Sequence, residues 1–473
     1  MTGIVAAAPL AVLTGAALLI LAADAFFPRR CRKIAGPGAV FALAAAAVGD
    51  ALSWGKGYVL FGGDLVLDGP AVVFIGLFCA AGMLVVLSGF GHVERRGIEP
   101  GAYHALLLFS CAGATVMVSS PNLLVILLGL EVLSISGYAL AGIDRADPRS
   151  TESAVKAFLT GSLASAFLIF GLAFLYGAAG SLEIPSILSA LGAPASAAWA
   201  GLVGLGLVVI GFAFKVALVP FHMWAPDVYE GAPTPITAFL TIAPKAAGFA
   251  VLLRLLGPPG SGPVPVRTAL GAVAGLTMVA ASLAALRQKN IKRLLAYSSI
   301  AHSGTMLLAV VAGDGSGLAF YLAVYLFMNV GAFGAVMALA GKDGDRLDLD
   351  SFAGAGYGSP WIAALFSVFL FSLAGFPPTG GFLAKFFVFA TAVDRGLVGL
   401  VVVALLASLV SVYYYLRVII VMYMKPLAPG RAEGPWPESG HPALYLVLFL
   451  CFYAVLQLGI MPGNLIDVIR QAF

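Results

Sequence analysis

Charged residues are scarce in this sequence. Only 10% of its 473 residues are Asp, Glu, Lys or Arg, whereas a soluble globular domain usually holds about 25%. Hydrophobic residues make up 61% and gather in long runs. This composition excludes a soluble globular protein and predicts a polytopic, all-α membrane protein. The net charge of +4 reflects a bias in the loops and does not indicate nucleic-acid binding.

Cysteine clusters and nucleotide-binding motifs are absent from the sequence. The four cysteines, at positions 31, 79, 111 and 451, form no CxxC pair and no Cys/His cluster. This spacing argues against a disulfide framework and against an iron–sulfur site. There is no Walker A motif, no GxGxxG between a strand and a helix, and no loop long enough for a soluble domain. Energy from ATP or electrons from NADH would therefore be handled by another chain.

Long apolar runs dominate what is present. A helix needs about 20 residues to cross a bilayer, and by this criterion we count fourteen spans, at roughly 4–24, 36–54, 71–90, 102–119, 122–142, 154–178, 198–219, 234–256, 268–286, 293–312, 317–340, 359–391, 397–424 and 442–461. The basic cluster PRRCRK follows the first run, so we interpret that run as a span and not as a cleaved signal peptide.

Basic residues are distributed unevenly among the loops. Of the 26 Lys and Arg residues, five lie inside spans, sixteen in loops after odd-numbered spans, and five in loops or ends after even-numbered spans. The positive-inside rule then places the odd-numbered loops in the cytoplasm and both termini on the outer side of a bacterial inner membrane. The longest loop, near 425–441, is rich in Pro and Gly.

Ionisable residues inside the spans are the main functional signal. They are Lys156, Lys215, Lys245, Lys385 and Glu131. A charge at the bilayer centre costs roughly 2.5–3.5 kcal/mol, and such groups usually belong to ion or proton pathways. The alternative is that they only link helices. Burial disfavours an ammonium and a nearby carboxylate favours it, so we expect Glu131 to pair with Lys156 or Lys215.

Polar residues accompany these groups at helical spacing. The sets are Glu131/Ser134/Tyr138, Lys156/Thr160, Thr237/Thr241/Lys245, Ser298/His302/Thr305 and Tyr321/Tyr325/Asn329. Each set lies on one face of a helix. Such stripes can hold water, and water with titratable side chains forms a proton path. Ordinary interhelical hydrogen bonding is the alternative for each stripe taken alone.

Two spans are predicted to be broken. Pro220 has no N–H and clashes with the carbonyl four residues earlier, so the helix must break or kink near Lys215. Broken backbone at membrane depth is tolerated where it lies within protein or lines a wet cavity, which suits Lys215 as a proton carrier. His222 either continues this path or has a structural role. A second break, in GFPPTGG at 375–381, precedes Lys385. Paired breaks are typical of inverted-repeat transporters.

Several segments also resemble a known family. They are GLEVLSISGYAL (129–140), ESAVKAFLTGSLASAF (152–167), FAFKVALVPFHMWAPDVYEGAPTPITAFLTIAPKAAGFAVLLR (212–254), RQKNIKRLLAYSSIAHSG (287–304) and GFPPTGGFLAKFFVF (375–389). These look like the antiporter-like membrane subunits of respiratory complex I, and most closely like subunit N of the bacterial NADH–quinone oxidoreductase. Related subunits L and M, sodium/proton antiporter subunits and membrane-bound hydrogenase subunits belong to the same superfamily.

The resemblance implies a fold of fourteen helices with two inverted five-helix repeats. Residues 1–101 would form an N-terminal three-helix segment, 102–256 the first repeat (helices 4–8), 268–424 the second repeat (helices 9–13) and 442–473 helix 14. Helices 7 and 12 would be broken.

The resemblance also implies a role for each candidate residue. Glu131 and Lys215 would form a control pair, Lys245 the central relay and Lys385 the terminal relay, while Lys156 and His302 match positions of less certain role. The chain would translocate protons as a subunit of a redox-driven NADH–quinone oxidoreductase. It would hold no cofactor or metal, because NADH, FMN, iron–sulfur clusters and quinone are expected in partner subunits. Its neighbours would be an antiporter-like subunit M and a small subunit K.

Two other functions remain open from the sequence. One is a subunit of a cation/proton antiporter complex without electron transfer. The other is a passive scaffold that bridges neighbouring subunits in the lipid bilayer. The scaffold predicts that neutral replacements of Lys215 or Lys245 leave activity and pumping unchanged.

Overall fold

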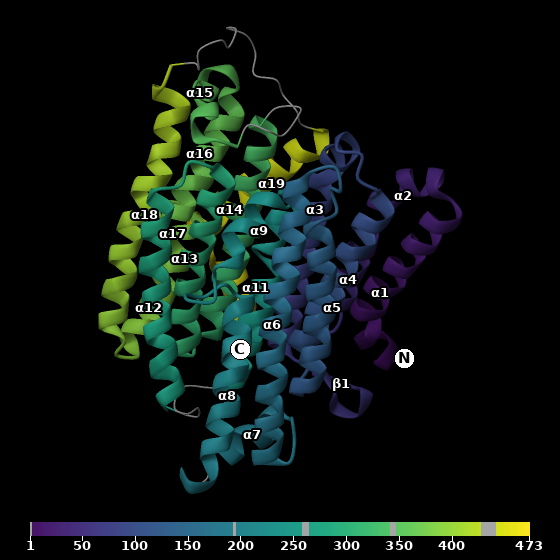
Figure 1. Ribbon diagram of the computed structural model, residues 1–473, viewed down its shortest axis with the longest axis vertical. Coiled ribbons are helices and arrows are strands. Elements are labelled where there is room, and N and C mark those ends of the chain that lie inside the picture. Colours follow the sequence, from purple (N-terminus) through teal and green to yellow (C-terminus); the bar gives the residue numbers. More distant parts are fainter. Residues whose placement is uncertain (1, 193–194, 258–263, 341–346, 427–440) are drawn as a thin grey trace.

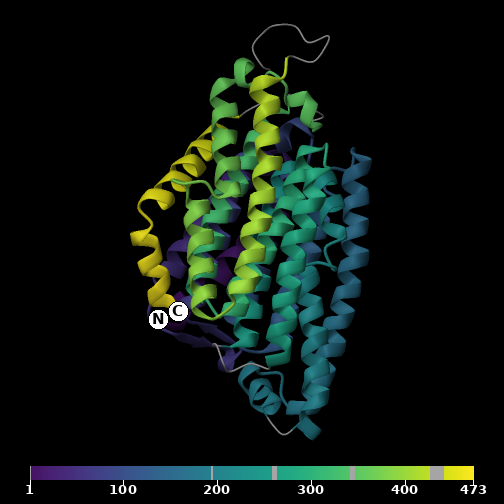
Figure 2. The ribbon, with the colours of Figure 1, turned by 90° about the vertical axis from the view of Figure 1, so that its left-hand side faces the viewer.

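Long helices run side by side along the longest axis of the molecule (Figures 1 and 2). The computed structural model describes residues 2–192, 195–257, 264–340, 347–426 and 441–473. Its longer helices are α1 (Thr2–Phe26), α2 (Pro28–Ala51), α3 (Gly69–Arg95), α4 (Pro100–Ser119), α5 (Leu123–Ala141), α6 (Pro148–Ala179), α8 (Ala195–Lys215), α12 (Val264–Leu286), α13 (Ile291–Ala312), α14 (Gly315–Leu339), α18 (Val398–Met424) and α19 (Pro442–Ile460).

Shorter elements connect or interrupt these helices. They are α7 (Ile184–Leu191), α9 (Trp224–Gly231), α10 (Thr234–Leu240), α11 (Ala243–Leu256), α15 (Ala355–Gly358), α16 (Pro360–Ala374), α17 (Gly380–Asp394), α20 (Gly463–Ala472) and the 3₁₀ turns η1 (Phe61–Gly63) and η2 (Leu349–Phe352). Strands β1 (Tyr58–Leu60) and β2 (Leu65–Leu67) form an antiparallel hairpin in which Tyr58 pairs with Leu67.

Local side chains set many helix boundaries. Among the described residues, an N-cap side chain accepts a backbone N–H at the starts of six helices. These capping residues are Asp68 at α3, Asn122 at α5, Asp147 at α6, Asn290 at α13, Asp314 at α14 and His441 at α19. Such caps satisfy donors that the first helical turn leaves free. At the other ends of α6 and α13, Gly180 and Gly313 adopt the left-handed conformation that commonly stops a helix.

The predicted membrane fold is confirmed at the level of class. Twelve helical segments in the described residues are long and apolar enough to span a membrane, and they coincide with twelve of the fourteen predicted spans. The remaining two predictions, 198–219 and 359–391, coincide with shorter apolar helices, Trp199–Lys215 in α8 and Pro360–Ala374 in α16.

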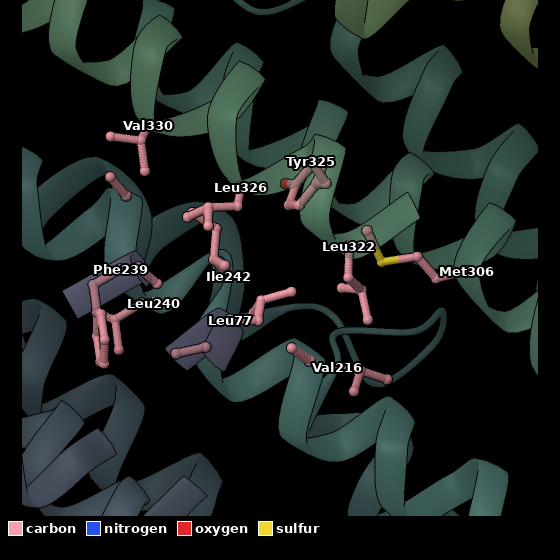
Figure 3. Packing of buried hydrophobic residues seen from close by; sticks show 14 of the residues in the cluster. Leu77, Val216, Phe239, Leu240, Ile242, Met306, Leu322, Tyr325, Leu326 and Val330 are labelled. Atoms are coloured by element: carbon pink, nitrogen blue, oxygen red, sulfur yellow. The ribbon is translucent and has the colours of Figure 1, made fainter. Parts of the chain in front are cut away.

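The centre of the molecule consists of α10, α11, α13 and α14. In the apolar window of Thr234–Leu256, 94% of residues are buried within the chain, against 33% for α6 and for α18. Figure 3 shows Val216, Ile242 and Leu326 in one apolar cluster, so interruptions of the backbone lie inside the core and not at its edge.

Ion pairs connect loops in the way that alternating spans require. Arg32 bonds Glu99, and Arg96 lies 3.8 Å from Asp144, so the loops after the first, third and fifth predicted spans meet at one end, here termed the basic end. At the opposite end, Arg254 bonds Asp68. Which end faces the cytoplasm stays a prediction. Of the basic residues counted in the sequence, Lys342, Arg346 and Arg431 lie outside the described residues, as does most of the 425–441 loop.

Candidate functional site

Helix α8 ends at Lys215, and a backbone motif that could not be predicted from the sequence stops it there. The N–H of Leu218 donates to the carbonyl of Ala213 (2.8 Å), and the N–H of Ala217 donates to that of Phe214 (3.0 Å). This pair of bonds is a Schellman motif, and Ala217 occupies its left-handed position with φ of +57°. Glycine usually fills that position, so only the following proline signals the break.

The backbone groups freed by the break are partnered within the protein. Val219 donates its N–H to the hydroxyl of Thr277 on α12 (3.0 Å). The Trp224 indole donates to the carbonyl of Phe214 (3.0 Å). Because an unpaired N–H or carbonyl at membrane depth costs several kcal/mol, these two bonds allow the interruption to persist and tie it to α12.

The side chain of Lys215 contacts α5, and its partner there is a hydroxyl and not a carboxylate. Its ammonium donates to the Ser134 hydroxyl (2.7 Å) and lies 5.4 Å from the centroid of the Tyr138 ring. Glu131, one turn before Ser134, accepts a hydrogen bond from Ser165 (2.5 Å). None of the ion pairs within the described ranges includes Glu131. In this structure Glu131 contacts Ser165 and Lys215 contacts Ser134, in place of the expected pairing of Glu131 with a lysine.

Lys156 is not as deeply placed as the apolar run around it predicted. Its side chain is 42% exposed, and its ammonium pairs with Glu152 (2.7 Å) and Asp227 (2.8 Å). The carboxylate of Asp227 arrives from α9, 71 positions away in the sequence. This tertiary contact explains why an intramembrane partner in Glu131 is not needed.

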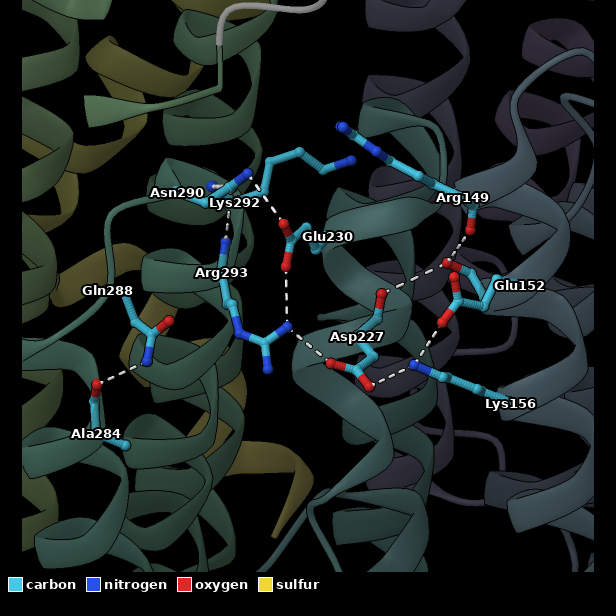
Figure 4. A network of polar contacts seen from close by, with 11 residues as sticks. Arg149, Glu152, Lys156, Asp227, Glu230, Ala284, Gln288, Asn290, Lys292 and Arg293 are labelled. Carbon is cyan, nitrogen blue, oxygen red and sulfur yellow. Dashed lines mark hydrogen bonds and ion pairs between the residues drawn. The ribbon is translucent and has the colours of Figure 1, made fainter. Parts of the chain in front are cut away.

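Asp227 is the centre of a charge network that sequence reasoning missed. Besides Lys156, it binds Arg293 on α13 (2.7 Å), and Arg293 also binds Glu230 (2.9 Å), as Figure 4 shows. Partial burial raises the pKa of the Asp227 carboxyl, but the hydrogen bonds from Lys156 and Arg293 outweigh burial and hold this pKa below its usual value. The network therefore joins α6, α9 and α13 at neutral pH. Its only sequence signal was the polar DVYEG run after Pro220.

Lys245 is fully buried in a cage of neutral oxygens. Its ammonium donates to the carbonyl (2.7 Å) and hydroxyl (2.6 Å) of Ser299 and to the hydroxyl of Ser303 (2.9 Å). These acceptors match the three donors of an ammonium. Tyr325 donates to the same Ser299 hydroxyl (2.8 Å). Throughout the described part of the chain, no carboxylate lies within ion-pair distance of Lys245.

The helix that carries Lys245 is itself interrupted. The sequence predicted one continuous span over 234–256, but α10 ends at Leu240 and α11 begins at Ala243. Pro244 lacks an N–H and crowds the carbonyl of Leu240, which accounts for the end of α10. The Thr241 hydroxyl at the interruption accepts a hydrogen bond from Asn329 on α14.

His302 lies between Lys245's cage and Lys385. Its Nδ1 is 2.6 Å from the Tyr321 hydroxyl, and its ring centroid is 5.3 Å from that of Tyr325. His302 and Lys385 line one cavity of about 20 Å³ with Ser282, Ser411 and Tyr414. A polar cavity of this size holds about one water molecule, so a single water can connect the imidazole with the ammonium.

Lys385, on α17, contacts the C-terminal end of α16. Its ammonium donates to the carbonyls of Leu373 (3.1 Å) and Ala374 (2.9 Å), the last residues of α16. Gly375 then turns the chain with φ of +92°. A cation at a helix C-terminus interacts favourably with the helix dipole, and Lys215, in the last turn of α8, occupies an equivalent electrostatic position.

His222 remains separate from these groups. It is half-buried, and its Nδ1 has no hydrogen-bond partner in the described part of the chain. Its side chain does contact the backbone of Pro220, and both of its roles, proton carrier or structural residue, stay predictions.

A small polar cavity lies at the basic end, beside the start of α10. It has a volume of about 40 Å³ and is lined by His92, Asp144, Lys292 and Thr234, among others. Thr234 begins a threonine stripe, continued by Thr237 and Thr241, that ends at Lys245. The stripe and the cavity therefore place polar groups along the inner face of α10 and α11.

Comparison with known proteins finds similar chains among the membrane subunits of NADH-quinone oxidoreductase. The family described as NADH:quinone oxidoreductase/Mrp antiporter, TM, matches residues 120–411. NADH-quinone oxidoreductase subunit N 1 of Solibacter usitatus is 41% identical, with 97% of this chain and 95% of that protein covered. Subunit N of Desulfovibrio desulfuricans is also 41% identical, over 99% and 96%.

Solved structures share the fold. A chain of respiratory complex I from Thermus thermophilus is 35% identical, with a TM-score of 0.83 over 97% of this chain and 98% of that one. A chain of the Mrp complex from Dietzia has a TM-score of 0.84 over 98% and 96%, but only 20% identity. This second likeness concerns the fold alone.

Proposed function

The chain belongs to the subunit N family of NADH-quinone oxidoreductase, and from this premise we propose that it relays protons across a bacterial inner membrane. The driving energy comes from electron transfer in partner subunits, which hold NADH, FMN, iron–sulfur clusters and quinone. No group of three or more His, Cys, Asp or Glu suited to a metal occurs among the described residues. The part of this chain is to move protons.

One observation carries the proposal: polar groups are nearly continuous from Lys245 to Lys385. Lys245 binds Ser299, which Tyr325 also binds, and Tyr325 lies against His302. His302 and Lys385 share the water-sized cavity. Hydrogen bonds join Lys245, Ser299 and Tyr325, a ring contact joins Tyr325 and His302, and the cavity lies between His302 and Lys385.

The remaining candidates extend this route at both ends. Glu131 and Lys215 act as the control pair on the side of α5, where Lys215 donates to Ser134, one turn after Glu131. The cavity at Lys292 and the threonine stripe supply the access from the basic end, which is cytoplasmic in this proposal. Lys156 acts by holding Asp227 and so positions the broken segment.

The topology follows the same premise. We infer fourteen spans, with α8 and α9 as the broken seventh and α16 and α17 as the broken twelfth. Residues 102–256 and 268–424 form two inverted five-helix repeats. The neighbours are an antiporter-like subunit M and a small subunit K, and both termini lie on the outer side.

The experiment that tests this function begins with the native membrane. Gentle extraction, a native gel and mass spectrometry locate the chain, and the same band is assayed for electron transfer from NADH to a quinone analogue. We expect co-migration with a large, active assembly that contains flavin and iron–sulfur clusters. A smaller band without redox subunits would instead support a cation/proton antiporter complex, the alternative that the sequence left open.

A further inference from the structure

A large cavity lies at the basic end, apart from the proton route. It has a volume of about 590 Å³ and lies between α2, α3, α4 and the start of α19. Its lining includes Arg32, Lys33, Phe90, Ile98, His104 and His441. Sites for small molecules usually measure about 300–1,000 Å³ and combine apolar walls with a few polar groups, and this cavity meets both conditions.

The rim of the cavity is basic. The first turns of α2 carry four basic residues, which only Cys31 interrupts: Arg29, Arg30, Arg32 and Lys33. All four side chains are exposed. Two carboxylates partly offset them: Glu99 pairs with Arg32 (3.0 Å), and Glu94 lines the cavity. Lys33 has no ion pair within the described residues. The rim therefore keeps a net positive charge, with one ammonium free to bind an anion.

An exposed apolar stripe descends from this rim along α2. Ile34, Phe41 and Val48 are 56%, 76% and 61% exposed. They follow one another at intervals of seven residues and so lie on one face of the helix. α1 and α2 form one edge of the molecule (Figure 1), so this face meets the surroundings of the chain and not its core. The basic rim matches the charged headgroup of a membrane lipid, and the apolar stripe matches its acyl chains.

We propose that this cavity binds the headgroup of an anionic phospholipid. The lipid phosphate lies at Arg32 and Lys33, and an acyl chain follows Ile34 and Phe41 along α2. Basic pockets between spans at the cytoplasmic surface recognise such headgroups. A free phosphate ion would leave the apolar stripe unused, and a zwitterionic lipid would leave the net charge of the rim uncompensated.

The test compares two double variants in the purified, assembled complex. Arg32→Gln with Lys33→Gln removes the charges that line the cavity. Arg287→Gln with Lys289→Gln removes equal charge from two exposed residues that belong neither to the rim nor to the lining. Phosphatidylglycerol and cardiolipin that remain bound after extraction are counted per complex by mass spectrometry. We expect the first variant to lose at least one anionic lipid per complex and the control to keep the wild-type number.

A second arm identifies the ligand. Delipidated complex is mixed with vesicles of phosphatidylglycerol or of phosphatidylcholine, or with inorganic phosphate, and thermal stability is measured. We expect an increase only with phosphatidylglycerol, and a clearly smaller increase in the cavity variant. Equal lipid counts in both variants, or an equal effect of phosphate alone, would overturn the proposal. If the double variant fails to assemble, Lys33→Gln alone gives the same comparison, because Lys33 has no ion pair to lose within the described residues. The test measures bound lipid and thermal stability, and neither NADH oxidation nor proton pumping. Its failure would therefore leave the proposed proton relay untouched.

Discussion

The Lys385 ammonium lies 2.9 Å from the carbonyl oxygen of Ala374, the last residue of helix α16. One cation thus closes the end of a helix that stops inside the bundle and also lines the cavity shared with His302. The consequence is a coupling: a change in the charge of Lys385 alters both the bond to the helix end and the contact with the water site.

Lys385→Met tests this coupling. The variant leaves the Leu373 and Ala374 carbonyls without their donor and removes a titratable group from the route. Proton transfer by a positioned side chain contributes roughly 100- to 10,000-fold to a rate, so we expect at least a tenfold loss of pumping in vesicles. The control is Lys425→Met, which removes an exposed lysine paired with Asp350. Pumping near the wild-type level in both variants would exclude Lys385 from the route.

Thr277→Val tests the bond that ties the first break to α12. Valine keeps the shape of threonine but leaves the Val219 N–H unpaired, which costs roughly 1–3 kcal/mol for a buried group. We expect a lower melting temperature of the assembled complex and reduced pumping. Thr277→Ser retains the hydroxyl and serves as the control. If valine and serine variants melt at the same temperature, the hydroxyl does not support the break.

Asp227→Asn tests the charge network at the basic end. The folded-state pKa of Asp227 lies below its ordinary value. Its contribution to stability is therefore fully present above the unfolded pKa, about 3.9, and is lost as the pH falls through the folded pKa. We expect Asp227→Asn to lower the melting temperature at pH 7 and to lower it by less at pH 3.

Glu152→Gln is the matched control for the Asp227 variant, because Glu152 binds Lys156 but not Arg293. Its side chain is 63% exposed, and exposed ion pairs contribute little. A loss in Asp227→Asn that is the same at both pH values would show that charge is not the cause.

Sequence patterns located the buried ionisable residues better than their partners. Pro220 follows the end of α8 at Lys215, and its missing N–H and steric clash act locally, so this helix end could be predicted from the sequence. Pro244 could have predicted the end of α10 in the same way, but the apolar run around it was interpreted as one continuous helix. The partners of Lys156 could not be read in this way, because Asp227 approaches only through the tertiary fold.

The oxygen cage of Lys245 was equally hidden in the sequence. Ser299 and Ser303 are ordinary residues of an apolar helix, and their roles depend on how α13 packs against α11. The stripe Ser298, His302 and Thr305 was recognised by its spacing, yet the acceptors of Lys245 lie one residue further around the helix. Helical period identifies faces, whereas packing decides which face meets which neighbour.

Proton translocation by Lys245 variants tests the central claim most directly. Purified complex in vesicles is driven by NADH and a quinone analogue, and protons moved per electron are measured for Lys245→Met and Lys245→Arg. An arginine keeps the positive charge but does not release its proton. The account predicts that pumping is lost in both variants, while Lys56→Met, at an exposed lysine, pumps normally. A proton-to-electron ratio in Lys245→Met equal to that of the unmodified complex would contradict it.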